Sequence, residues 1–100
     1  MQHVPGRSPD KIVAVHLKVS GFVHGVSYRA NMAWVANERG VRGWVRNLPD
    51  GTVEAVLEGE KPRVDAVVEW AKKGPPRAVV RGVEVKPVQV RYHRSFSIEP

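Results

Sequence analysis

The stretch "IVAVHLKVSGFVHGVSYR", residues 12–29, changes its apolar pattern halfway along. Large apolar side chains occupy every second position from Val13 to Val19, which predicts a strand over residues 12–20 with one buried side. Residues 21–27 contain two glycines and predict a loop. Helical spacing then predicts a helix from about residue 27 to residue 39. The stretch is therefore a strand–loop–helix unit.

The rest of the chain predicts further strands and a second helix. A turn at Leu48–Gly51 joins two short apolar runs into a hairpin, and the second helix begins near Pro62 and ends before Gly74. The predicted further strands are residues 41–47, 52–57, 78–87 and 95–99. This order predicts an α+β fold of the ferredoxin-like, split βαβ type (β-α-β-β-α-β plus a short C-terminal strand), an antiparallel sheet with two helices on one face.

That topology brings distant residues together. The first and second strands should run parallel with the third between them, joined by a right-handed crossover. Their C-terminal ends then lie about 10 Å apart at one edge of the sheet. Arg29, which follows the first strand, and Asn47, which ends the second, should therefore converge.

The glycine-bearing loop predicts an anion site. A helix N-terminus presents unpaired N–H groups with the positive end of the helix dipole behind them, and glycine lets the preceding backbone curl around an anion. Arg29 adds a planar set of donors that suits phosphate. Neither GxxxxGK[ST] nor GxGxxG occurs here. On spacing alone, a plain glycine turn with a surface arginine explains the stretch equally well.

Length and composition exclude several classes of protein. One hundred residues predict one domain, here residues 11–100, after a flexible N-terminal tail at residues 1–10. The absence of cysteine excludes disulfides, thiol catalysis and Cys-type zinc sites, and is consistent with a cytoplasmic protein. The four histidines have no metal-binding spacing, so no metal is expected, and no apolar run is long enough to predict a membrane partner.

Two stretches resemble the signatures of the acylphosphatase family. GFVHGVSYR, residues 21–29, resembles GxVQGVxFR. GWVRNLPDGTVEAVLEG, residues 43–59, resembles the second signature, in which a Gly-aromatic pair precedes an asparagine and spaced glycines. SFSI, residues 95–98, resembles the family's C-terminal strand. His24 stands where glutamine is usual and Tyr28 where phenylalanine is usual.

The resemblance implies an activity and a set of site residues. The family hydrolyses acyl phosphates to a carboxylate and inorganic phosphate, without metal or cofactor, which implies an acyl phosphate substrate and phosphate as product and inhibitor. Its phosphate-binding arginine corresponds to Arg29 and its water-orienting asparagine to Asn47. Its phosphate-binding loop corresponds to Val23, His24, Gly25, Val26, Ser27 and Tyr28. A monomer is the default expectation.

A nucleic-acid-binding module on the same fold is the alternative. The formal net charge of +6 would suit it. RNA recognition by this fold needs aromatic side chains on the open face of the sheet, and the predicted third strand, TVEAVLE, has none. No nucleic-acid partner is therefore expected. The three tryptophans, Trp34, Trp44 and Trp70, are interpreted as core or partly buried packing residues.

Overall fold

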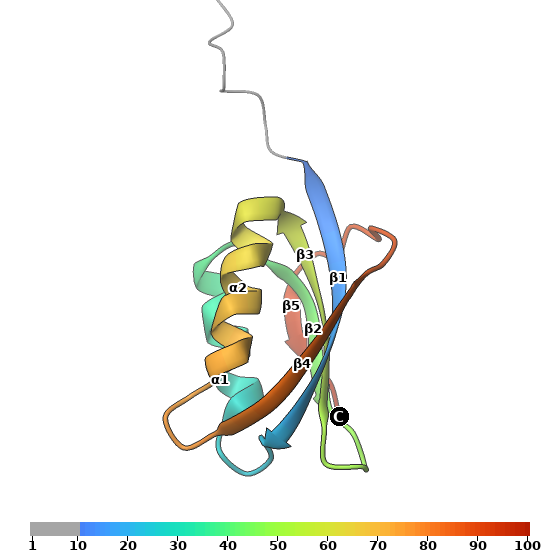
Figure 1. Ribbon diagram of the computed structural model, residues 1–100. Coiled ribbons are helices and arrows are strands. Elements are labelled where there is room, and N and C mark those ends of the chain that lie inside the picture. The colour runs from blue at the N-terminus through green and yellow to red at the C-terminus, as the bar shows by residue number, and fades with distance from the viewer. Residues whose placement is uncertain (1–10) are drawn as a thin grey trace, which may run out of the picture.

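The computed structural model, which describes residues 11–100, has the predicted order of elements followed by a short final strand (Figure 1). The elements are β1 (Ile12–Phe22), α1 (Tyr28–Glu38), β2 (Arg42–Asn47), β3 (Val53–Glu60), α2 (Lys61–Lys73), β4 (Val79–Pro87) and β5 (Phe96–Ile98). The ferredoxin-like α+β prediction is confirmed. The prediction of a tail at residues 1–10 lies outside the described residues.

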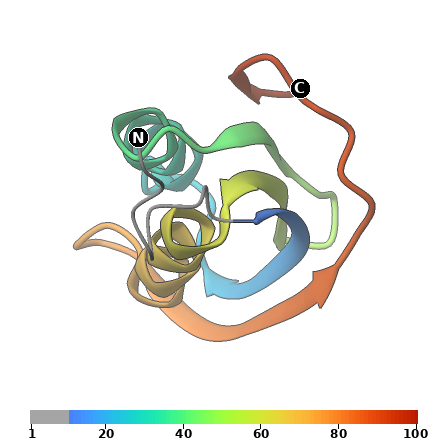
Figure 2. The same cartoon turned by 90° about the horizontal axis from the view of Figure 1, so that it is seen from above.

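The strands form one sheet in the order β4-β1-β3-β2-β5. β3 lies between β1 and β2 and is antiparallel to both, so β1 and β2 run parallel and end at the same edge, as predicted. β5 pairs in parallel with β2, which makes the sheet mixed rather than wholly antiparallel. The reason is the connection 88–95, which leaves β4 at one edge and passes round the sheet on the side away from the helices to the opposite edge (Figure 2).

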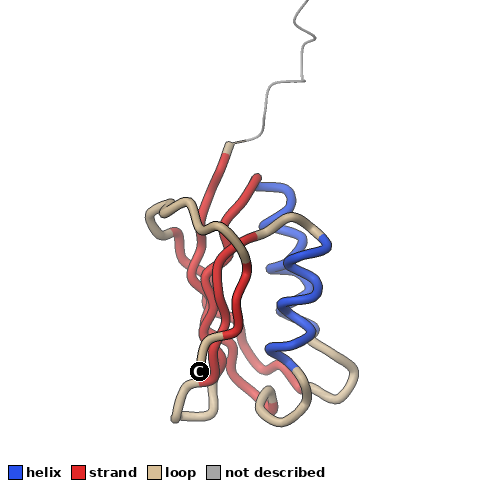
Figure 3. Tube along the Cα trace, turned by 180° about the vertical axis from the view of Figure 1, so that it is seen from behind, coloured by secondary structure: helices blue, strands red, loops and turns tan. Residues whose placement is uncertain are grey.

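Both helices cover one face of the sheet (Figure 3). The apolar stripe of α2, predicted from its spacing, is buried against the sheet. α1 buries residues four positions apart on one side. The side chains at the centre of this interface include Leu17, Met32, Val45, Leu57, Val64 and Val67. Burial of these side chains, at about 1.5–3 kcal/mol each, holds α1 against β2 and β5, and α2 against β1, β3 and β4.

Trp34 differs from its prediction. Tyr28, Met32 and Ala36 define the buried side of α1, and Trp34 lies off that side with 65% of its surface exposed. Trp70 packs against the core, as interpreted from the sequence. Within residues 11–100 neither helix has the length and apolar character needed to cross a membrane.

The opposite face of the sheet carries polar side chains held in pairs. Glu54 on β3 accepts hydrogen bonds from Arg46 Nε and His16 Nε2, both at 2.7 Å. Farther along β3, Glu58 is fully buried and accepts hydrogen bonds from the connection 88–95. This second cluster fixes the path by which the chain reaches β5.

Candidate active site

The two glycines of the strand–helix unit have different structural roles. The loop was predicted to begin at Gly21, but β1 continues to Phe22 and Gly21 lies at an irregularity in its pairing with β4. A Cβ on Gly21 would lie 2.1 Å from the carbonyl oxygen of Val79, and its φ is +123°, so a side chain is excluded by contact and by conformation. Gly21 therefore serves the sheet, and Gly25 is the glycine that lies in the loop before α1 and lines the pocket there.

The loop after β1 has the curled backbone of an anion-binding nest. Gly25 has φ +72° and Ser27 has φ 63°, so two left-handed residues alternate with ordinary ones just before α1. Within residues 11–100 none of the N–H groups of residues 24–27 donates to a backbone carbonyl. Ser27 is the N-cap of α1 and makes no side-chain capping bond. The loop thus presents unpaired donors at the positive end of a helix.

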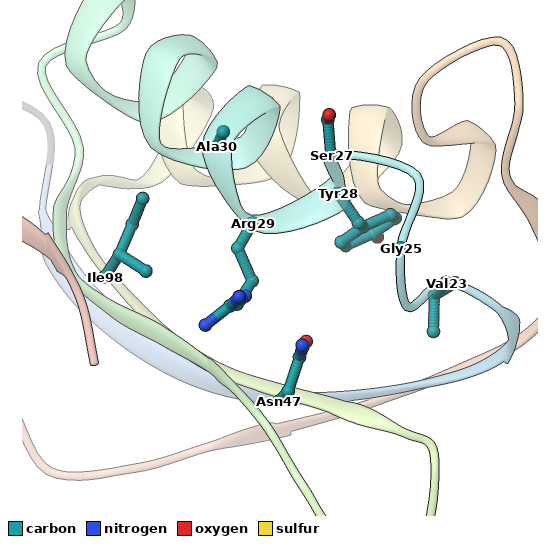
Figure 4. A pocket seen from close by; sticks show the side chains of 8 residues that line it. All are labelled: Val23, Gly25, Ser27, Tyr28, Arg29, Ala30, Asn47 and Ile98. Atoms are coloured by element: carbon teal, nitrogen blue, oxygen red, sulfur yellow. The ribbon is translucent and has the colours of Figure 1, made fainter. Parts of the chain in front are cut away.

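A pocket of about 180 Å³ lies beside this loop (Figure 4). It is bounded by the loop, the first turn of α1 and the ends of β2 and β5, and its lining residues are Val23, Gly25, Ser27, Tyr28, Arg29, Ala30, Asn47 and Ile98. Arg29 comes from the first turn of α1, and its guanidinium points across the pocket toward Asn47 (Figure 4). Arg29 has no carboxylate partner among residues 11–100, so its donors face the pocket unneutralised.

Asn47 reaches the pocket from the last residue of β2, where it is the register partner of Val53. Its Oδ1 is buried and has no hydrogen-bond partner among the described residues. An unpaired buried acceptor costs about 1–3 kcal/mol, and such exceptions in native structures call for an explanation. Because no bond fixes this oxygen, the amide can turn and offer it to a donor in the pocket.

Most of the predicted site residues meet at this pocket. Arg29, Asn47, Val23, Gly25, Ser27 and Tyr28 all line it. The side chains of two loop residues point elsewhere, because Val26 is buried in the core and His24 Nε2 lies 2.8 Å from the carbonyl oxygen of Thr52. Those two residues can contribute backbone N–H groups to the loop, but their side chains do not line the pocket.

Sequence reasoning missed Ala30 and Ile98. Ala30 lies one position after Arg29 in the first turn of α1, so helix geometry alone could have indicated it. Ile98 is the parallel register partner of Val45, two residues before Asn47, and this places it at the pocket. The missing information was the direction of β5, which the sequence of three strand residues does not specify.

Tyr28 has a structural hydroxyl. Burial raises the pKa of this phenol far above its ordinary value, so it stays protonated. The hydroxyl donates to the carbonyl oxygen of Ala71 at 2.7 Å, and the ring contacts Trp70 at 5.3 Å between centroids. Tyr28 therefore ties the first turn of α1 to the last turns of α2, with its ring at one wall of the pocket.

The donor set of the pocket suits an oxyanion. Its polar groups are N–H groups, a guanidinium, a hydroxyl and a carboxamide, and none of its lining residues is His, Cys, Asp or Glu. Within residues 11–100 there is no cluster of three such side chains that could hold a metal ion. These groups can bind the oxygens of a phosphoryl group and position a water molecule.

The chain was compared with known proteins. The sequence profile of the family described as acylphosphatase matches residues 15–98. The acylphosphatase of Thermococcus kodakarensis is 57% identical over 76 residues, which is 76% of this chain and 84% of that protein. An acylphosphatase structure from Coxiella burnetii superimposes with a TM-score of 0.85 at 35% identity, covering 88% of this chain and 93% of that one.

A second solved structure gives the same result. The acylphosphatase of Bacillus subtilis superimposes with a TM-score of 0.85 at 32% identity, over 90% of this chain and 100% of that one. The match to the family profile, over residues 15–98, spans the loop, α1 and the β2–β3 hairpin that form the pocket. The chain belongs to the acylphosphatase family.

Proposed function

We propose that this acylphosphatase hydrolyses acyl phosphates by direct, metal-free attack of water, with Arg29 and the loop N–H groups holding the phosphate and Asn47 orienting the water. The observation that carries this proposal is the convergence of Arg29 and Asn47, from two elements, on one pocket beside unpaired N–H groups (Figure 4). The products are a carboxylate and inorganic phosphate.

The loop and Arg29 act on the phosphoryl oxygens. Phosphoryl transfer spreads charge over three equatorial oxygens, and fixed N–H donors around them stabilise that charge without reorganising during the reaction. Gly25 and Ser27 set the curl that aims the N–H groups, and Arg29 supplies a fork of donors from the other side. These groups bind the substrate, the transition state and the phosphate product.

Asn47 acts on the nucleophile. Its Oδ1 accepts a hydrogen bond from the attacking water and holds that water in line with the phosphorus–oxygen bond that breaks. Positioning is what the carboxamide can supply, since it is not a base at neutral pH. The unpaired state of this oxygen in the protein is explained if the water supplies its donor.

The leaving group explains why no general acid lines the pocket. A bond forms between the water oxygen and phosphorus, and the bond between phosphorus and the acyl oxygen breaks with its electron pair. The carboxylate that leaves has a conjugate acid of pKa about 4, so it departs without protonation. The water proton passes to a phosphoryl oxygen.

The same proposal includes the inhibitor, the oligomeric state and the cell compartment of the enzyme. Inorganic phosphate, which carries the oxygens that the pocket binds, acts as a competitive inhibitor. A monomer is sufficient for this mechanism, because every group that it uses belongs to one chain. The absence of cysteine fits a reducing cytoplasm.

The test is steady-state hydrolysis of benzoyl phosphate. Turnover should be unaffected by a chelator, and inorganic phosphate should raise KM without changing kcat. Arg29→Gln should lower kcat/KM by about 1,000-fold or more, because it removes both binding and transition-state donors. Circular dichroism of the variant should match the wild type. Near-normal turnover by a folded Arg29→Gln variant would contradict the proposal.

A further inference from the structure

The side chain of His24 joins the two halves of the pocket. It belongs to the loop that carries the N–H donors, yet its Nε2 lies 2.8 Å from the carbonyl oxygen of Thr52, 28 residues away in sequence. This contact is partly buried. A carbonyl oxygen can only accept, so His24 Nε2 carries a hydrogen and donates.

The acceptor closes the turn next to Asn47. The carbonyl oxygen of Thr52 also accepts the N–H of Leu48 at 2.9 Å, and Leu48 directly follows Asn47. Thr52 is held in turn by Asp50, whose carboxylate accepts the N–H of Thr52 at 3.0 Å. One carbonyl oxygen therefore ends the β2–β3 turn and receives the imidazole of the phosphate loop.

The loop and Asn47 otherwise come from separate elements. The loop follows β1, and Asn47 ends β2, with β3 between these strands. In-line attack needs the water on Asn47 and the phosphate on the loop to be held at a fixed separation, and a displacement of about 1 Å can cost 100-fold in rate. A direct bond between the loop and the turn fixes this separation more closely than the sheet alone.

We propose that His24 is a positioning residue, whose hydrogen bond to Thr52 sets the distance between the phosphate loop and Asn47. The imidazole does not line the pocket, so it acts through the turn and not on the phosphate. This inference rests on the proposed roles of the loop and Asn47. It also accounts for the substitution at this position, because the glutamine usual in the family carries an N–H donor of similar reach.

The test compares His24→Ala with His24→Gln. His24→Ala removes the donor and should lower kcat for benzoyl phosphate about 10-fold, with KM and the inhibition constant of phosphate changed by about 2-fold or less. His24→Gln keeps an N–H donor and should restore kcat to within about 3-fold of the wild type. His16→Ala is the matched control, since it removes a histidine hydrogen bond of 2.7 Å on the open face of the sheet. It should leave kcat unchanged.

A double-mutant cycle separates positioning from general loosening. If His24 acts by positioning Asn47, His24→Ala should cause no further loss of kcat in an Asn47→Ala background, because the group that it positions is gone. If His24→Ala lowered kcat in the Asn47→Ala background by the same factor as in the wild type, about 10-fold, the inference would be overturned. A rise in the phosphate inhibition constant that matches the loss of kcat would also overturn it.

The outcomes also distinguish this inference from the proposed function. A folded Asn47→Ala variant with normal turnover would remove the basis of both. An inactive Asn47→Ala variant beside a fully active His24→Ala variant would overturn the role of His24 alone.

Discussion

The two ends of the β2–β3 ladder each contain a buried side-chain oxygen, which is hydrogen-bonded at one end and unpaired at the other. Near one end Asn47 pairs with Val53, and its Oδ1 has no partner among the described residues. At the other end Arg42 pairs with Glu58, whose carboxylate is fully buried and accepts the N–H groups of Arg91 and His93, each at 2.9 Å.

With the proposed role of Asn47, the difference separates a polar group that serves stability from one that serves chemistry. Glu58 also accepts a hydrogen bond from His93 Nδ1 at 2.9 Å, so its two oxygens are satisfied within the protein. Buried polar groups are normally paired in this way. Asn47 leaves an acceptor open at the wall of a pocket, which is the arrangement expected of a group whose partner arrives with the substrate. Four predictions can break or sharpen this contrast.

Glu58→Ala should give the largest change in stability. It leaves the N–H groups of Arg91 and His93 without the buried carboxylate that accepts them and releases the connection 88–95, so the free energy of unfolding should fall by about 3–5 kcal/mol. The measurement is urea denaturation. Well below the melting temperature the variant should keep its kcat, since Glu58 does not line the pocket.

The matched control for Glu58 is Glu69→Ala. Glu69 pairs with Lys72 on the exposed surface of α2, and losing this pair should cost about 0.5 kcal/mol or less. Equal losses in the two variants would show that burial and triple hydrogen bonding give Glu58 no special role.

Asn47→Ala should show the reverse behaviour. Loss of the proposed water-orienting group should lower kcat by about 100- to 1,000-fold, equivalent to about 3–4 kcal/mol in the barrier. The free energy of unfolding should change by about 1 kcal/mol or less, because the removed oxygen has no partner to lose. Benzoyl phosphate turnover and urea denaturation measure the two quantities. A stability loss as large as that of Glu58→Ala would end the contrast.

Much of the fold and of the site can be predicted from residues 12–59. Alternation in β1, helical spacing in α1 and the turn before β3 fix the split βαβ order, and this order alone brings Arg29 and Asn47 to one edge. The signature-like stretches then give the chemistry. Local pattern and global topology agree here, and for this reason the order of strands and helices could be predicted from the sequence.

The features that were missed depend on contacts distant in sequence. Gly21 was assigned to the loop because two glycines four positions apart indicate a turn, whereas the need for glycine at this position comes from the close approach of Val79. The parallel direction of β5, and with it Ile98, depends on how Glu58 holds the connection 88–95. The tie between His24 and Thr52 becomes visible only once β1 and β3 lie side by side.

Acidification should weaken the hydrogen bonds that Glu58 makes, whereas Asn47 has no group that titrates in this range. Burial acts to raise the pKa of the Glu58 carboxyl, but the bonds from Arg91 N–H and from the His93 ring and N–H hold it below its usual value. A carboxyl with a lowered pKa in the folded state stabilises the protein above its unfolded pKa of about 4.3, and this contribution is lost as the pH falls through the folded value.

The measurement for this third prediction is the melting temperature between about pH 6 and pH 3, across the range in which carboxyls titrate. Wild-type protein should lose more stability than Glu58→Gln, which has no carboxyl to titrate at that position. The wild type and Asn47→Ala should lose stability in parallel. If the melting temperatures of the wild type and Glu58→Gln changed identically with pH, the attachment of the connection 88–95 would not depend on the ionised carboxylate.

Tyr28→Phe gives the smallest expected effect. It tests whether a side chain at the pocket wall can stabilise the fold, as Glu58 does, without affecting turnover. Its hydroxyl donates to the carbonyl oxygen of Ala71, which would otherwise lack a donor because Pro75, four residues later, has no N–H. Removing this bond should lower the free energy of unfolding by about 1 kcal/mol. kcat should stay within about 2-fold of the wild type, because the ring that forms the wall remains. If the loss of kcat, expressed as an increase in the activation free energy, exceeded the loss of unfolding free energy, Tyr28 would resemble Asn47. Its hydroxyl would then act on the reacting groups and not on the packing of α1 against α2.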